Sequence, residues 1–200
     1  DINDAIFYTL DASSPDNTKE QYHKPFTINK TQVVRAAAYH KNFVRSDIAS
    51  EIFLEKQHHL PVLAIITDSS NLWGPLGIYT NYAKTGILWE RFAQFKYMEN
   101  GRLVTSFNAG IRIQGASSIG MPKKSFRLFF RSEYGNAKLE FPLFGNENFS
   151  VFDNLVLKSG YDDDLTTSKG TLLRDALMNT LWQRSGGIAT QSAWSVLYIN

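Results

Sequence analysis

The sequence predicts an α+β protein in which a small β-sandwich precedes a mostly antiparallel β-sheet with one main packed helix. Two observations predict this class. Segments with alternating apolar and polar residues recur along most of the chain, and one segment, residues 171–185, has apolar residues at helical spacing. The 200 residues are 43% hydrophobic and 14% aromatic, which is enough material for a sizeable core. We expect two domains, residues 1–55 and 60–200, joined by a linker at residues 56–59.

Charge and composition limit the function classes. The 21 basic and 19 acidic residues give a net charge of +2, so nucleic acid is not an expected partner and any anion site must be local. No apolar run approaches the roughly 18 to 20 residues of a membrane helix, so no membrane-spanning segment is expected in this chain. Because the chain contains no cysteine, it has neither disulfides nor thiolate metal sites, and cysteine usage leaves the compartment open.

The first domain is expected to contain four short strands, at residues 6–10, 25–28, 31–39 and 48–54. Short strands separated by turn signals such as DASSPDN (residues 11–17) are typical of a small β-sandwich. In the linker, His58 and His59 are adjacent, which raises the alternative of a metal site. They lack partner ligands at a suitable spacing, so we interpret them as solvated linker residues.

The second domain opens with a near-continuous apolar run at residues 60–67, which is typical of a strand buried on both faces. Further along, Asn100 and Gly101 separate the patterned runs 89–98 and 103–107. Asn-Gly between such runs is the strongest short-range hairpin signal. We therefore expect an antiparallel hairpin that leads into the next stretch.

Residues 108–130, NAGIRIQGASSIGMPKKSFRLFF, form the stretch around which the second domain is organised. Ile111 and Ile113 alternate with polar residues before a loop, and Phe126 and Leu128 alternate with polar residues after it. Small residues dominate the loop, so its backbone amides could approach a ligand closely. The pattern predicts two half-buried strands, joined by a loop that ends in two lysines.

The candidate phosphate-binding residues all lie in this stretch: Lys124, Lys123, Arg127, Ser117 and Ser118. Lys124 has the parity of the buried Phe126 face, whereas Lys123 and Arg127 share the opposite face. A lysine at the mouth of a strand with its side chain aimed inward can act as a point charge for a phosphate. The alternative is that both lysines lie in water at a hairpin end and that Arg127 is a solvated strand residue, because the loop matches no Walker-type sequence.

The remaining predicted elements are a short aromatic segment at 139–144, strands at 153–157 and 194–199, and the helix at 171–185. Ser168 is a candidate cap for this helix, and Gly186 is expected to end it.

Three consecutive acids, Asp162, Asp163 and Asp164, precede the helix. They could ligate a divalent cation, but adjacent acids in a loop are usually solvated or serve as helix caps. We therefore assign no metal ligand in this chain. For Arg174 and Asp175 at the helix start we expect structural salt bridges.

The first domain resembles the Ig-like module of the chitobiase/β-hexosaminidase C-terminal type. The segments that carry the resemblance are YTLDASSP, QYHKPFTI and VVRAAAY. Ala12 stands where the family pattern usually has a glycine. The resemblance implies an Ig-like β-sandwich that serves as an accessory or spacing module.

The second domain resembles the N-terminal part of the spore coat protein H (CotH) kinase-like family over about residues 60–200. The segments that carry this resemblance are LPVLAIITD, GIYTN, WERFAQFKYMENG, GIRIQGASS with PKKSFRL, FDNLVLKSGYDD and TLLRDALMNTL. Because the chain ends at Asn200 directly after a strand, the domain is expected to be truncated.

The resemblance to CotH implies an atypical protein kinase that transfers phosphate from ATP to serine or threonine of a partner protein with Mg or Mn. It assigns Lys124 to the nucleotide phosphates, with Lys123 or Arg127 as substitutes. The catalytic and metal-binding acids of the family are expected beyond Asn200, so no catalytic residue is assigned here and this fragment alone is expected to be inactive. The protein substrate stays unknown.

Two functional hypotheses follow. In the first, the full-length form is a secreted or surface bacterial kinase. In the second, the chain is a non-catalytic surface adhesion module, or a carbohydrate- or protein-binding module. Both resembled modules are typical of exported bacterial proteins, which implies an extracellular or cell-surface location.

Overall fold

A computed structural model describes residues 4–41, 44–166 and 168–200, which fold into two compact units. The first unit contains residues 1–80, 91–108 and 195–200, and the second contains residues 81–90 and 109–194. The predicted α+β class is confirmed at this level, because the chain is mostly β with several sheets and one main helix. The domain boundaries expected from the sequence stay a prediction.

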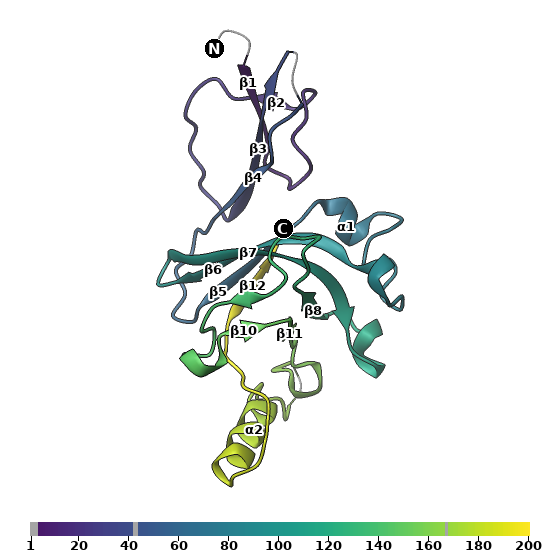
Figure 1. The fold of residues 1–200 in the computed structure, drawn as a ribbon, viewed down its shortest axis with the longest axis vertical. Helices are drawn as coiled ribbons and strands as arrows, with labels where there is room; N and C mark the ends of the chain where they lie inside the picture. Colours follow the sequence, from purple (N-terminus) through teal and green to yellow (C-terminus); the bar gives the residue numbers. More distant parts are fainter. Residues whose placement is uncertain (1–3, 42–43, 167) are drawn as a thin grey trace. The chain divides into compact units, whose positions relative to one another are not determined.

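The N-terminal strands form one antiparallel four-stranded sheet in the order β2-β1-β3-β4 (Figure 1). These strands are β1 (Asp4–Thr9), β2 (Glu20–Gln21), β3 (Gln32–His40) and β4 (Ala49–Phe53). In β3 the buried residues Val33, Arg35 and Ala37 alternate with less buried neighbours. The period-2 pattern of this segment therefore identified the strand correctly.

The strand predicted at residues 25–28 is wrong, because this segment is irregular and the sheet uses β2 instead. Pro25 has no backbone N–H to contribute to a ladder. Phe26 instead stacks on Tyr8, with 4.9 Å between the ring centroids. The apolar Phe26 is therefore explained by ring packing and not by a strand.

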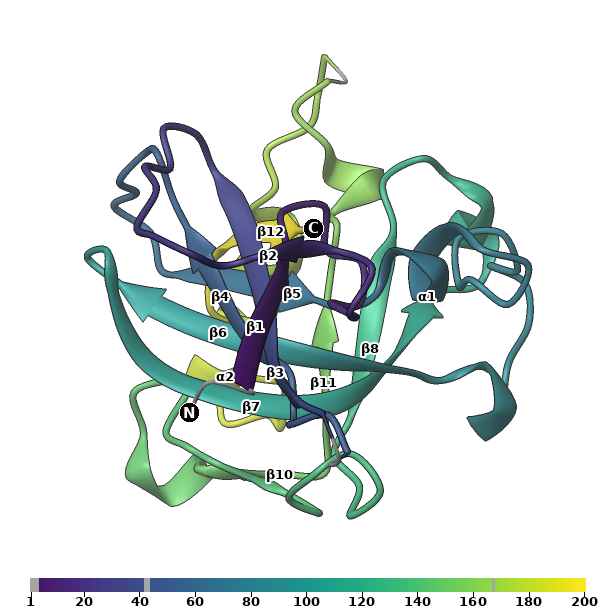
Figure 2. The ribbon, with the colours of Figure 1, turned by 90° about the horizontal axis from the view of Figure 1, so that it is seen from above.

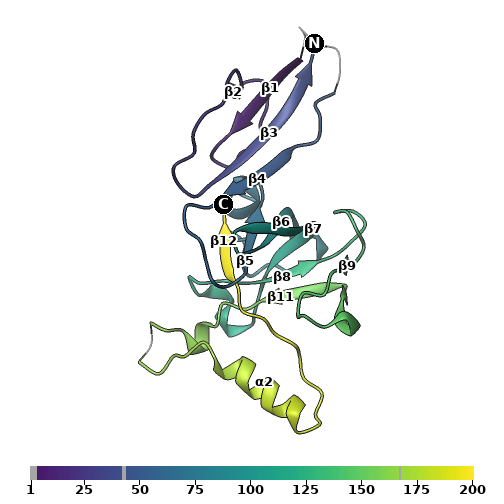
Figure 3. The same ribbon diagram turned by 90° about the vertical axis from the view of Figure 1, so that its left-hand side faces the viewer.

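A six-stranded sheet follows in the order β11-β8-β7-β6-β5-β12 (Figure 2). Its strands are β5 (Val62–Ile66), β6 (Arg91–Glu99), β7 (Arg102–Gln114), β8 (Ser125–Phe129), β11 (Asn154–Leu157) and β12 (Val196–Ile199). All five residues of β5 are buried, which confirms the strand expected to be covered on both faces. Strand β12 pairs with β5 in parallel (Figure 3), whereas β5 with β6, β7 with β8 and β8 with β11 pair antiparallel.

The hairpin between β6 and β7 turns at Asn100 and Gly101, as predicted. Their φ values of 51° and 74° are both positive, as a tight two-residue hairpin turn requires. Strand β7 is longer than the sequence indicated, because it runs without interruption for 13 residues to Gln114. Gly110 within it lies against Tyr134, where an added Cβ would be 2.3 Å from Cε2 of the ring. This close approach explains a glycine inside a strand.

The core of the first unit joins its two sheets. Val33 of β3 and Ile52 of β4 belong to one buried cluster with residues of β5 and β6, namely Val62, Ala64, Ile66 and Met98. Leu54, Val196 and Tyr198 pack against this cluster. Within this unit, the β3–β4 sheet and the β5–β6 strands therefore share one hydrophobic core.

The shorter elements are α1 (Ser69–Trp73), η1 (Ile87–Trp89), η2 (Ser117–Gly120), β9 (Leu139–Glu140), η3 (Glu147–Phe149), β10 (Val151–Phe152) and η4 (Tyr161–Asp163). Strands β9 and β10 form a two-stranded sheet of their own.

The predicted helix is present as α2 (Arg174–Arg184), and Gly186 follows its end with φ of 89°, as expected. Its cap is not Ser168. The carboxylate of Asp163 accepts hydrogen bonds from the N–H groups of Thr171 (2.8 Å) and Arg174 (3.0 Å). No sequence motif links an acid to a helix that starts eleven residues later, so this cap could not be read from the pattern.

The packing expected for this helix is not confirmed. No residue of α2 is buried, and its apolar side chains Leu177 and Leu181 are 54% and 50% exposed. In Figures 1 and 3, α2 lies apart from the strands of its own unit. Helical spacing identifies an apolar face, but it does not identify what covers that face.

Among the residues that the structure describes, we find no helix with the length and apolar character needed to cross a membrane.

Candidate functional site

The candidate residues lie on the antiparallel hairpin of β7 and β8 and on the loop between them. Ile111 pairs with Leu128, and Ile113 pairs with Phe126. These four side chains are at most 4% exposed, so they form the apolar face of the hairpin. Arg112 and Arg127 also pair across the strands, on the opposite face.

The loop contains a short 3-10 turn that carries both candidate serines. Gly115 enters it with φ of 147°, where a side chain would be strained. Ser117 is exposed and Ser118 is half-buried. Two loop amides are already used within the loop, since Ile119 N–H donates to Ala116 O (3.3 Å) and Met121 N–H donates to Ser118 O (3.0 Å).

Lys124 is half-buried at the end of this loop, immediately before β8. Its Nζ donates to the backbone oxygen of Ile119 at 2.7 Å and lies 4.4 Å from the centroid of the Tyr82 ring. Burial lowers the pKa of Lys124 below the ordinary lysine value. Among the described residues no carboxylate lies within ion-pair distance of this amine. The charge of Lys124 is therefore partly desolvated but not neutralised.

Lys123 has a different environment, although it is the adjacent residue. Its Nζ donates to Oδ2 of Asp164 at 2.9 Å, and its side chain is 53% exposed. The backbone N–H of Thr166 and the Lys123 amine together lower the pKa of Asp164 to about 2. The positive charge of Lys123 is thus already paired with a carboxylate.

Two of the three acids in the run 162–164 have structural partners. Asp163 caps α2 and forms an ion pair with Arg174 (3.4 Å), and Asp164 binds Lys123. Asp175 pairs with Lys158 at 2.6 Å, so the salt bridges expected at the helix start are confirmed. Across residues 4–41, 44–166 and 168–200, no three His, Asp or Glu side chains gather as a possible metal site.

Arg127 belongs to a group of arginines around Phe129. The guanidinium carbons of Arg112, Arg131 and Arg127 lie 4.7, 5.2 and 6.0 Å from the centroid of the Phe129 ring. The Nε atom of Arg127 is buried and has no hydrogen-bond partner among the described residues. Arg127 is therefore half-buried beside the Phe129 ring, and its Nε lies away from solvent.

Sequence reasoning missed the buried carboxylate next to this group. The side chain of Glu90 is 1% exposed and accepts two hydrogen bonds from Arg131, 2.9 Å from Nε and 3.0 Å from Nη2. Arg112 Nη1 lies 3.9 Å from Glu90 Oε1, and the Tyr134 hydroxyl donates to Oε2 at 3.5 Å. The only available signal was a lone acid near the start of the patterned run 89–98, and it does not identify partners 41 and 44 residues away.

Two family models match the chain, and both agree with the resemblances noted from its motifs. The Fn3 associated model matches residues 1–53. Residues 111–200 match the CotH kinase protein family. No curated protein and no solved structure matches the chain significantly. The matches confirm a small β module followed by part of a CotH-like region.

The CotH match starts at Ile111 and includes all five candidate residues. Within it, the structure brings Lys124 to the loop that carries Ser117 and Ser118, pairs Lys123 with Asp164 and leaves Arg127 on the other face. The described residues fit an anion at Lys124, since this amine has no counter-charge. They offer no group of three possible ligands for a divalent metal, because Asp163 caps α2 and Asp164 pairs with Lys123.

Proposed function

We propose that this chain supplies the nucleotide-phosphate site of a CotH-like atypical protein kinase, with Lys124 as the residue that holds the phosphate. One observation carries the proposal: within the CotH-matching stretch, Lys124 is a half-buried cation with no carboxylate partner among the described residues. A desolvated ammonium attracts a phosphate oxygen more strongly than a solvated one does, because the surroundings screen the charge less.

The chemistry of this site follows from the placement of Lys124. An incoming phosphate oxygen can accept from an N–H of Lys124 that does not bind Ile119, since an ammonium has three donors and the structure uses one for that carbonyl. The Tyr82 ring and the loop would keep the amine in place and limit its contact with water. Lys124 thereby neutralises phosphate charge, which is the role of a strand lysine in phosphoryl transfer.

The proposal extends to the complete protein. With ATP and Mg or Mn bound, it would transfer the terminal phosphate to serine or threonine of a partner protein, at the cell surface or outside the cell. The metal would be held by acids other than those described here. The Ig-like fold of the first 55 residues and their accessory role are part of the same proposal and rest on the match to the Fn3 associated model.

The test uses the full-length protein that contains this chain, incubated with ATP labelled at the γ-phosphate and with Mg or Mn. Phosphoserine and phosphothreonine in the protein and in added acceptor proteins are measured. We expect Lys124→Met to reduce incorporation at least tenfold, whereas Lys123→Met, the matched control, retains it. Equal incorporation by wild type and Lys124→Met would contradict the assignment. Absence of incorporation and of ATP binding in the wild type would favour the non-catalytic adhesion or binding module.

A further inference from the structure

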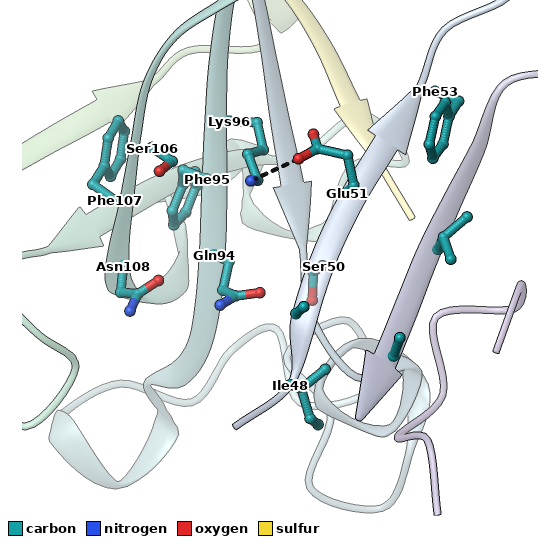
Figure 4. Close-up of a pocket in the computed structure, with 13 residues that line it drawn as sticks. Ile48, Ser50, Glu51, Phe53, Gln94, Phe95, Lys96, Ser106, Phe107 and Asn108 are labelled. Atoms are coloured by element: carbon teal, nitrogen blue, oxygen red, sulfur yellow. Dashed lines mark hydrogen bonds and ion pairs between the residues drawn. The ribbon is translucent and has the colours of Figure 1, made fainter. Parts of the chain in front are cut away.

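The first unit contains a cavity of about 470 Å³ between β3 and β4 on one side and β6 and β7 on the other (Figure 4). Its volume falls in the range of roughly 300–1,000 Å³ that is typical of small-molecule sites. None of the candidate phosphate-binding residues lines it. The cavity is therefore a separate feature from the proposed nucleotide site.

Uncharged polar side chains line one part of this cavity. Gln94 of β6 and Asn108 of β7 lie next to each other in Figure 4, and Ser106 and Ser50 also contribute to the lining. An amide side chain both donates and accepts hydrogen bonds, as does a hydroxyl. This lining therefore matches a ligand whose groups are donors and acceptors at the same time.

The charges in the cavity neutralise each other. Lys96 Nζ donates to Oε2 of Glu51 at 3.0 Å, and the lysine side chain is only 15% exposed (Figure 4). A charged ligand would have to compete with this pair, so a neutral ligand is favoured. Oε1 of Glu51 also accepts from the N–H of Ile52 at 3.2 Å, which satisfies a donor of the edge strand β4. This contact opposes the addition of a peptide strand at that edge.

The rest of the lining is apolar, with Val34 and Ala36 of β3 and Phe53 of β4. Phe53 is 45% exposed, so its ring is accessible to a ligand. A neutral molecule that has many hydroxyl groups and apolar C–H faces combines the two kinds of surface that this cavity offers. We propose that the cavity binds a neutral monosaccharide or disaccharide.

The proposal is tested on the whole chain by amide NMR titration with glucose, galactose, N-acetylglucosamine, maltose and cellobiose. For ligands of this size we expect dissociation constants on the order of 1 mM for at least one sugar. The side-chain amide signals of Gln94 and Asn108 should shift. The double substitution Gln94→Ala with Asn108→Ala should weaken binding at least tenfold, whereas Asn154→Ala, an exposed amide of the second unit, should leave it unchanged.

The melting temperature of the double variant without ligand separates binding from folding. It should stay close to that of wild type, whereas sugar affinity should fall. The proposal is overturned if no sugar shifts these signals, if the double variant binds as wild type does, or if only an extended peptide binds. Loss of ATP binding has no bearing on this test, since the two sites share no residue.

Discussion

Among the carboxylates with a described ion pair, that of Glu90 is the most buried. Replacing Glu90 by glutamine removes its charge and leaves the size of the side chain nearly unchanged. The Glu90 side chain is 1% exposed, and those of Arg131 and Arg112 are 36% and 18% exposed. Removing one partner of a buried pair costs about 3–5 kcal/mol, but solvent screens the exposed third of Arg131. We therefore expect E90Q to lower the free energy of unfolding by about 2–3 kcal/mol.

Thermal unfolding followed by calorimetry measures this loss. For a chain of this size, 1 kcal/mol corresponds to about 2–4 °C, so the melting temperature should fall by roughly 4–12 °C. The matched control is Asp153→Asn, because Asp153 pairs with Lys138 at 3.7 Å and its side chain is 73% exposed. That variant should change stability by less than about 0.5 kcal/mol. If E90Q costs no more than the control, the buried contacts of Glu90 with Arg131 and Arg112 do not stabilise the fold to the extent expected.

Two further predictions concern the second unit. Gly110→Ala should destabilise it by about 1–3 kcal/mol in urea unfolding, because the new Cβ overlaps the Tyr134 ring; an unchanged midpoint would contradict the packing described. The Thr166 N–H and Lys123 lower the pKa of Asp164 to about 2. The ionised carboxylate therefore contributes fully to stability above the unfolded pKa of 3.8, and this contribution is lost as pH falls towards 2. The protection factors of the amides at residues 160–166, which correct for the intrinsic pH dependence of exchange, should therefore fall as pH falls from about 4 to 2, and Asp164→Asn should reduce this fall. An unchanged fall in that variant would assign it to another group, such as Asp163, whose pKa is also lowered.

Most strands could be predicted from the sequence, because alternation of apolar and polar residues follows directly from the geometry of a half-buried strand. The prediction succeeded for β3, β5 and the Asn100-Gly101 hairpin. It failed at residues 25–28, where Phe26 packs on the ring of Tyr8 instead of forming part of a strand. Pro25 argued against a strand there, because proline has no N–H to donate to a ladder.

The contacts of the candidate residues could be predicted only in part from the sequence. Parity predicted different environments for the two lysines, and in the structure Lys124 is half-buried whereas Lys123 is exposed and pairs with Asp164. Lys123 and Asp164 are 41 residues apart in the sequence, and so are Glu90 and Arg131. Contacts over such separations depend on how strands and loops meet in space, and periodicity contains no information about them. The cavity lined by Gln94 and Asn108 escaped prediction for the same reason.

The most direct test of the central claim is calorimetric titration of this chain with ATP, with and without Mg or Mn. Wild type, Lys124→Met and Lys123→Met are compared under the same conditions. We predict saturable binding by wild type and Lys123→Met, with affinity at least tenfold lower for Lys124→Met. Equal affinities of the two lysine variants, or a stronger loss for Lys123→Met, would contradict the assignment of the phosphate site to Lys124.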